Sequence, residues 1–161
     1  MVVEFVDLEC PFCAQHHEVV EQHLNRDSSG ITFRFAHFPL SMHRFATPAA
    51  RAAECAAAAG RFFEFVAVVM RGRDSLGLKS WGQYAAAAGI QDTAAVGRCA
   101  REGGTVARIE RGLALGRRAG VGSTPTVVID GKRLVPTPTD GELSAILDSL
   151  AMRARRRGGT R

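Results

Sequence analysis

Residues 2–13 have the sequence VVEFVDLECPFC, and the rest of the chain is arranged around this stretch. Its first five residues are mostly β-branched or aromatic, which predicts a buried strand. Two cysteines follow, Cys10 and Cys13, separated by Pro11 and Phe12. Pro11 suits the first turn of a helix, because the N–H group that proline lacks would have no partner there. The pattern therefore predicts a strand followed by a helix that begins at Cys10.

The position of Cys10 at a helix N-terminus favours a reactive thiol. Unpaired N–H groups and the helix dipole stabilise a thiolate there. Cys13 lies three residues further along, on the same helix face and within reach of a disulfide with Cys10. The pair is therefore predicted to exchange disulfides.

Two other interpretations of this pair stay open. Cys10 and Cys13 could be half of a metal site in a redox- or zinc-responsive binding module, or an inert structural pair. The candidates for further metal ligands are His16, His17 and His23. The remaining cysteines, Cys55 and Cys99, stand alone, so no second Cys-x-x-Cys completes a four-thiolate site.

Length and composition indicate a globular chain. A length of 161 residues fits one domain with room for an inserted subdomain. The formal net charge is +5, and residues 153–161 carry five arginines and no acid, so the body is neutral and no nucleic-acid partner is expected. This tail is predicted to be a disordered, solvated end, and contact with anionic lipid or nucleic acid is the alternative.

The compartment depends on the true N-terminus. No apolar run approaches membrane-spanning length, so no membrane span is expected. The pattern of a secretion signal is absent from the first residues given. If a signal lies upstream, we expect an exported, periplasmic or cell-envelope protein, and if Met1 is the true start, a cytoplasmic one.

The chain beyond the first helix continues an α/β pattern. Alternation at residues 31–37 predicts a second strand, which completes a parallel βαβ unit. Residues 39–120 have helical patterns throughout. Their phenylalanines and Trp81 are assigned to the core of this block, with a peptide-binding face as the alternative.

The C-terminal part returns to strands. Residues 126–129 and 132–135 are predicted to form a hairpin around Asp130-Gly131. A capping box that begins at Thr139 predicts a final helix. The antiparallel hairpin and the parallel pair together make a four-stranded mixed sheet flanked by helices.

This order of motifs resembles that of the DsbA-like thiol:disulfide oxidoreductases, which have the thioredoxin fold, over nearly the whole chain. The matching motifs are CPFC at 10–13, FAHFPL at 35–40 and GSTPT at 122–126. Cys-x-x-Cys alone is a weak motif, but its combination with Thr-Pro before a strand and hairpin is specific. The resemblance implies a thioredoxin-like domain at 1–38 and 121–152, with an inserted helical subdomain at 39–120.

The resemblance also implies roles for the site residues. Cys10 would be the exposed nucleophile and Cys13 the resolving cysteine. Pro125 would be a cis-proline whose turn presents the Thr124 backbone to an extended substrate peptide. An ordinary trans bond at the strand entry is the alternative. The residues expected to tune the thiolate and the substrate-facing surface are Pro11 and Phe12.

Glu4 is a carboxylate in an otherwise apolar strand, which needs a reason. The resemblance implies an acid beneath the dithiol that helps to move protons, with Arg34 or His37 as its partner. A partly exposed glutamate at the strand edge is the alternative. The residues assigned to the surface are Glu9, His16 and His17.

The resemblance further suggests a disulfide between Cys55 and Cys99 that staples the helical insertion. Two separate buried thiols are the alternative. Such a bridge would favour an oxidising compartment.

The predicted function is exchange of disulfides with cysteines of unfolded or folding polypeptides. The likeness favours an oxidase or isomerase over a cytoplasmic reductase, while the direction depends on the reduction potential. We expect a redox partner that recycles the dithiol, and no cofactor besides the Cys10–Cys13 disulfide. A relative that conjugates glutathione or isomerises small aromatic acids is disfavoured, because such enzymes seldom need a resolving thiol.

Overall fold

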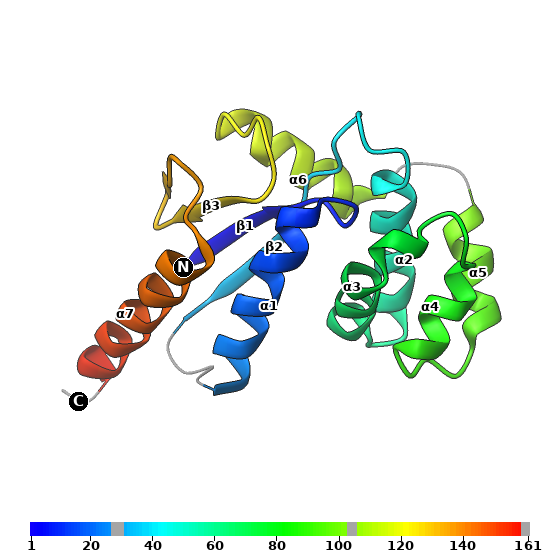
Figure 1. Ribbon diagram of the computed structural model, residues 1–161, viewed down its shortest axis with the longest axis horizontal. Helices are drawn as coiled ribbons and strands as arrows, with labels where there is room; N and C mark the ends of the chain where they lie inside the picture. Colours follow the sequence, from blue (N-terminus) through cyan, green and yellow to red (C-terminus); the bar gives the residue numbers. More distant parts are fainter. Residues whose placement is uncertain (27–30, 103–105, 159–161) are drawn as a thin grey trace.

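The structure is a computed structural model that describes residues 1–26, 31–102 and 106–158 (Figure 1). In chain order its elements are β1 (Val2–Val6), α1 (Pro11–Arg26), β2 (Phe33–His37), α2 (Ala46–Ala58), α3 (Phe62–Arg71), the 3₁₀ turn η1 (Arg73–Ser75), α4 (Trp81–Ala87), α5 (Thr93–Arg101), α6 (Ala107–Arg118), β3 (Thr126–Ile129), β4 (Lys132–Arg133) and α7 (Asp140–Gly158).

The four strands form one mixed sheet in the order β2-β1-β3-β4, which confirms the predicted fold class. Strand β1 lies at the centre, parallel to β2 and antiparallel to β3. Glu4 therefore has neighbours on both sides, Phe35 in β2 and Val127 in β3. Because side chains alternate along a strand, Glu4 shares one face with Val2 and Val6.

Helices α1 and α7 cover this first face of the sheet (Figure 1). A buried cluster joins them to the strands through Val2, Val20, Val127, Leu143 and Leu147. The apolar stripe of the last helix thus lies against the sheet. This packing holds α1, and with it the two cysteines, across the carboxyl end of β1.

Helix α6 covers the opposite face and approaches the strands closely because of two glycines. A Cβ atom at Gly112 would lie 2.2 Å from the carbonyl oxygen of His37, and one at Gly116 would lie 2.4 Å from the ring of Phe38. Only hydrogen in place of a side chain lets the helix backbone come this near. The contact fixes the end of β2 next to α6.

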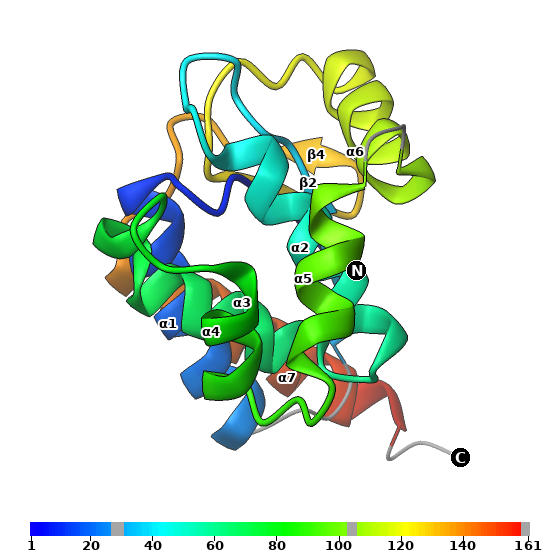
Figure 2. The same cartoon turned by 90° about the vertical axis from the view of Figure 1, so that its right-hand side faces the viewer.

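Helices α2, α3, α4 and α5 form a block beyond the carboxyl end of β1 (Figures 1 and 2). Its core contains Phe65, Val66 and Tyr84, and it is continuous with the two cysteines that begin α1. The division of the chain at residues 38 and 120 stays a prediction. Helix α6, although within the predicted insertion, packs on the sheet rather than in this block.

The prediction of a disordered tail from residue 153 is wrong for most of its length. Helix α7 continues to Gly158, and Ala151 within its last turns is buried. Alanine, methionine and arginine all have high helix propensity, and no glycine or proline lies between residues 142 and 157. Residues 159–161 lie outside the described part of the chain.

Candidate active site

Strand β1 leads through a short turn into α1, as predicted from the sequence. Pro11 is the first residue of α1, so Cys10 lies directly at its N-terminus. The amide of Cys10 donates to the carbonyl of Asp7 at 3.2 Å, which closes the turn. Cys10 and Cys13 are both free thiols in this structure.

Cys10 has the electrostatic character of a nucleophile. A hydrogen bond from the Cys13 thiol, opposed by burial, lowers the pKa of Cys10 to about 5. The backbone N–H groups of Cys13 and Phe12 and the side chain of Thr124 contribute in the same direction. Cys10 is therefore a thiolate at neutral pH.

The implied exposure of Cys10 is wrong, because only 4 % of this residue is exposed. Its sulfur lies 3.3 Å from the carbonyl oxygen of Thr124, to which the thiol form donates. The loop that carries this carbonyl thus covers the sulfur. Phe12, by contrast, is 64 % exposed at the rim of the site.

Cys13 has the opposite character. Burial raises the pKa of Cys13, and the neighbouring Cys10 raises it further. The backbone N–H of Asp7 donates to the Cys13 sulfur at 3.5 Å and acts against this rise. The two thiols therefore differ in proton affinity, as a nucleophile and a resolving cysteine do.

The peptide bond between Thr124 and Pro125 is cis, and this loop lies beside Cys10. A groove of about 610 Å³ runs between the loop, the start of α1 and the segment before α7. Its lining includes Phe12, His16, Ser123, Thr124, Pro125 and Pro138. The groove can hold an extended peptide next to the dithiol.

Glu4 lies beneath α1 and is only 2 % exposed, so the alternative of an exposed strand-edge residue is wrong. Its partner is His16, whose Nδ1 is 3.5 Å from Glu4 Oε1. The assignment of His16 to the surface is also wrong, because α1 turns this ring towards the sheet. His16 Nε2 donates to the carbonyl of Pro138 at 2.8 Å, on the wall of the groove.

His16 is poised to carry a positive charge. Burial favours its neutral form, but the hydrogen bonding and charge of Glu4, aided by Pro138 and Asp140, raise the pKa of His16 above its usual range. His16 thus connects the buried Glu4 carboxylate to the groove. An imidazole in this position can pass a proton between the two.

Neither predicted partner of Glu4 contacts it. His37 Nε2 instead lies 2.8 Å from Glu54 of α2, and Arg34 is exposed on the outer strand. His37 follows Phe35 by two positions in β2 and points into the helical block, where its ring packs against Phe62. His37 lies on the same face of the sheet as Glu4 but opposite Val6, two residues further along β1, and Arg34 lies on the other face.

The remaining histidines of α1 have separate surroundings. His17 is half-buried, and burial lowers its pKa. His23 is buried, with Nδ1 3.2 Å from Asp148 of α7. In the part of the chain that the structure describes, no three His, Cys, Asp or Glu side chains are arranged to hold a metal ion.

Cys55 and Cys99 form a disulfide, which confirms the predicted bridge. The bond joins α2 to α5 with a Cα–Cα distance of 6.0 Å. It ties α5 to α2 within the helical block and leaves the active-site pair as the free thiols.

Two residues of the site, Asp7 and His43, are not predicted from the sequence pattern. Asp7 is 1 % exposed at the end of β1, and its carboxylate lies 2.8 Å from His43 Nδ1. The available signal was an acid directly after an apolar strand and three residues before Cys10. His43, in an irregular loop, gave no such signal.

The fold and the site together define a class of protein. A thioredoxin-like sheet with a helical insertion and a Cys-x-x-Cys pair at its first helix is the fold found in solved DsbA-like structures. The chain belongs to the thioredoxin family, because the family model described as thioredoxin matches residues 1–149.

Solved structures share this fold at low sequence identity. A thioredoxin-like oxidoreductase from Silicibacter pomeroyi DSS-3 is 24 % identical, with a TM-score of 0.70, and the match covers 96 % of this chain and 86 % of that one. Oxidised BdbD from Bacillus subtilis is 17 % identical, with a TM-score of 0.75 and coverage of 94 % and 86 %. Alpha-DsbA1 of Wolbachia pipientis is 19 % identical, with a TM-score of 0.74, and the match covers 97 % of this chain and 87 % of that one.

The curated relatives are much longer proteins. The Na(+)/H(+) antiporter NhaA of Herminiimonas arsenicoxydans is 31 % identical over 156 residues, which are 92 % of this chain and 23 % of the relative. NhaA 3 of Salinispora tropica is 31 % identical over 134 residues, 82 % of this chain and 20 % of the relative. The chain thus spans about a fifth of these relatives. None of the helices in its described part is long and apolar enough to cross a membrane.

Proposed function

We propose that this chain exchanges disulfides with cysteines of other proteins, with Cys10 as the nucleophile and Cys13 as the resolving thiol. The observation that carries the proposal is the Cys10 thiol, whose pKa is lowered to about 5 beside the Thr124–Pro125 loop. A thiolate at neutral pH is the form that attacks disulfides, and a thiol of low pKa also leaves readily.

We propose that the chain acts as a disulfide donor. The stabilised Cys10 thiolate favours the reduced form of the pair, which makes the oxidised form a strong oxidant. A client thiolate attacks Cys10 of the Cys10–Cys13 disulfide and releases Cys13 as a thiolate, which takes up a proton. A second client thiolate then attacks the client sulfur of the mixed disulfide. The client disulfide forms, and Cys10 leaves as the stabilised thiolate.

The groove beside the dithiol is the proposed client site. The Thr124 backbone next to Cys10 can align an extended chain, as peptide recognition at a strand edge does. The exposed Phe12 ring provides an apolar contact at the rim. Unfolded or folding polypeptides offer both features, an extended backbone and exposed apolar side chains.

The proposed reaction requires a redox partner, and the chain's second disulfide bears on the compartment in which it acts. Oxidation of a client leaves two electrons on Cys10 and Cys13, so a redox partner has to recycle the pair. Exchange between thiols and disulfides uses no cofactor besides these two sulfurs. The disulfide between Cys55 and Cys99 supports an oxidising compartment outside the cytoplasm.

The reduction potential of the Cys10–Cys13 pair in glutathione buffers tests this proposal. We expect a value near the oxidising end of the thioredoxin-fold range, about −120 mV, and refolding of a reduced client protein by the oxidised chain. A value near about −270 mV would make the chain a reductase instead. Full exchange activity in a Cys10→Ser variant would overturn the assignment of the nucleophile.

A further inference from the structure

Asp7 contacts both cysteines of the dithiol through its peptide groups. Its N–H donates to the Cys13 sulfur at 3.5 Å, and its carbonyl accepts from the Cys10 amide at 3.2 Å. The N–H contact lowers the pKa of a thiol that burial otherwise raises. The orientation of this one residue therefore acts on the proton affinity of Cys13.

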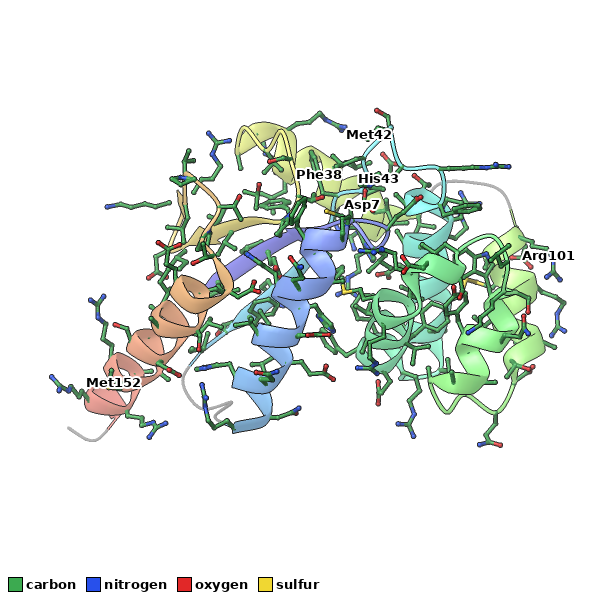
Figure 3. All side chains as sticks on the ribbon, in the orientation of Figure 1. Asp7, Phe38, Met42, His43, Arg101 and Met152 are labelled. Atoms are coloured by element: carbon green, nitrogen blue, oxygen red, sulfur yellow. A yellow bond between two sulfur atoms is a disulfide. The ribbon has the colours of Figure 1, made fainter. Side chains whose placement is uncertain are left out.

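The Asp7 side chain is held from the opposite loop. One carboxylate oxygen, Oδ2, accepts from the Leu40 amide and from His43 Nδ1, both at 2.8 Å. The other, Oδ1, accepts from the Glu9 amide at 2.8 Å. His43 is the only side chain among these three donors, and it comes from the loop between β2 and α2. Figure 3 shows Asp7 and His43 next to each other, with Met42 further out on the same loop.

A buried carboxylate needs every one of its hydrogen bonds, because leaving it without them is costly. Asp7 is 1 % exposed, whereas the His43 ring is 21 % exposed and closes the site towards solvent. Without His43, Oδ2 would keep only the Leu40 amide as a donor, and the Asp7 carboxylate would shift towards water. Its peptide groups belong to the same short turn and would turn with it.

We infer that Asp7 and His43 are a positioning pair for the resolving cysteine, with His43 fixing the Asp7 carboxylate so that the Asp7 N–H stays directed at Cys13. The inference rests on the proposed function. In the proposed donation, Cys13 leaves as a thiolate when a client attacks Cys10, and in the reverse of that step the Cys13 thiolate attacks the Cys10 sulfur of the mixed disulfide. The Cys10–Cys13 bond forms, and the client sulfur leaves as a thiolate. The Asp7 N–H stabilises the attacking form of Cys13 in this step.

A second contact between the same turn and the same loop provides a control for the effect of loop anchoring alone. Glu9 Oε2 accepts from the amide of Phe45, which ties the same turn to the same loop. This contact involves neither Asp7 side-chain atoms nor a cysteine. Glu9→Ala should therefore disturb loop anchoring without altering the orientation of the Asp7 carboxylate.

When the reduced protein reacts with dithiobis(nitrobenzoate), the two cysteines react one after the other and can be followed as two phases. The first thionitrobenzoate leaves when Cys10 forms the mixed disulfide, and the second leaves when Cys13 displaces it. In His43→Ala we expect an unchanged first phase and a second phase slowed about tenfold, the loss expected for one hydrogen bond to a charged group. His43→Asn, whose amide can replace Nδ1 as the donor, should restore most of the rate, and Glu9→Ala should leave both phases unchanged.

A second measurement separates positioning from a structural role. On a Cys10→Ser background, the pH profile of Cys13 alkylation should shift to higher pH in His43→Ala and not in Glu9→Ala. If His43→Ala does not fold, the comparison of His43→Asn with His43→Gln replaces it, and the glutamine variant should be the slower one. Equal second phases in the wild type and the His43 variants, or equal slowing by Glu9→Ala, would overturn the inference. A wild type without any second phase would instead contradict the proposed function.

Discussion

The sulfur of Cys10 lies 3.3 Å from the carbonyl oxygen of Thr124, although 114 residues separate them in the sequence. Strand β3 pairs antiparallel to β1, and this pairing brings the start of β3 to the end of β1, where α1 begins. The central pairing of the sheet thus brings together the Cys10 sulfur and the cis-proline loop. The reactivity of Cys10 therefore depends on contacts made at this junction.

The Cys13 thiol should be the main stabiliser of the Cys10 thiolate, since its hydrogen bond is the largest influence that lowers the pKa of Cys10. In Cys13→Ala, we expect the pKa of Cys10 to rise from about 5 by at least about one pH unit. Thiolate absorbance at 240 nm as a function of pH measures it. Cys13→Ser, which keeps a hydroxyl donor, should show a smaller rise, and an unchanged pKa in both variants would contradict this account.

The stability of the reduced protein should increase with pH between about 5 and 9. The pKa of Cys10 is lowered from 9.0 when unfolded to about 5 when folded, so the thiolate stabilises the fold fully above pH 9 and loses this contribution as the pH falls through 5. The expected slope is at most about 1.4 kcal/mol per pH unit. Urea unfolding of the reduced and oxidised forms measures it, since the oxidised form lacks this titration and should give a smaller slope.

The ion pair between His16 and Glu4 predicts the opposite dependence on pH. The pKa of His16 is raised in the folded state, so its stabilising charge is fully present below its unfolded pKa and is lost as the pH rises through the folded value. His16→Leu should lower the free energy of unfolding by about 3 kcal/mol at pH 6, because Glu4 is left buried without its partner. The difference from the wild type should shrink towards pH 9, and a difference that grows with pH would contradict the pairing.

Removal of the second disulfide should affect stability and leave the chemistry intact. The bond closes a loop with a sequence separation of 44, for which chain entropy predicts about 4 kcal/mol. The double variant Cys55→Ala, Cys99→Ala should unfold at correspondingly lower urea concentration. The pKa of Cys10 should stay the same, because neither residue is among the groups that lower it. A shift of that pKa would show that the bridge shapes the active site.

The sequence predicts those parts of the site that local patterns encode. Cys10, Pro11 and Cys13 follow from a strand, a proline and a helix in immediate succession. His16 and His17 are neighbours with the same side chain, and only the rotation of α1 against the sheet decides that His16 meets Glu4. That rotation depends on packing against α7, which periodicity did not specify.

Contacts between distant loops are harder to predict from the sequence. Asp7 and His43 are 36 residues apart, and His43 belongs to a loop without periodicity, so nothing local links them. The prediction for the C-terminal end of α7 is wrong for a different reason. Its run of arginines suggested a solvated tail, although the same residues favour a helix. Charge pattern and helix propensity point in different directions there, and the structure follows propensity.

The close approach of α6 to β2 gives a prediction with an internal control. In Gly112→Ala, the new methyl group would meet the His37 carbonyl at 2.2 Å, and a backbone atom cannot move aside as a flexible side chain can. We expect a loss of about 3 kcal/mol in the free energy of unfolding, because overpacking forces α6 away from the sheet. Gly97→Ala in α5 is the matched variant, since its Cβ would have only ordinary contacts, the nearest at 3.5 Å. Alanine is the better helix former, so this second variant should be about 1 kcal/mol more stable than the wild type. If both glycine variants lose stability equally, the tight contact between α6 and His37 is not what requires glycine at position 112.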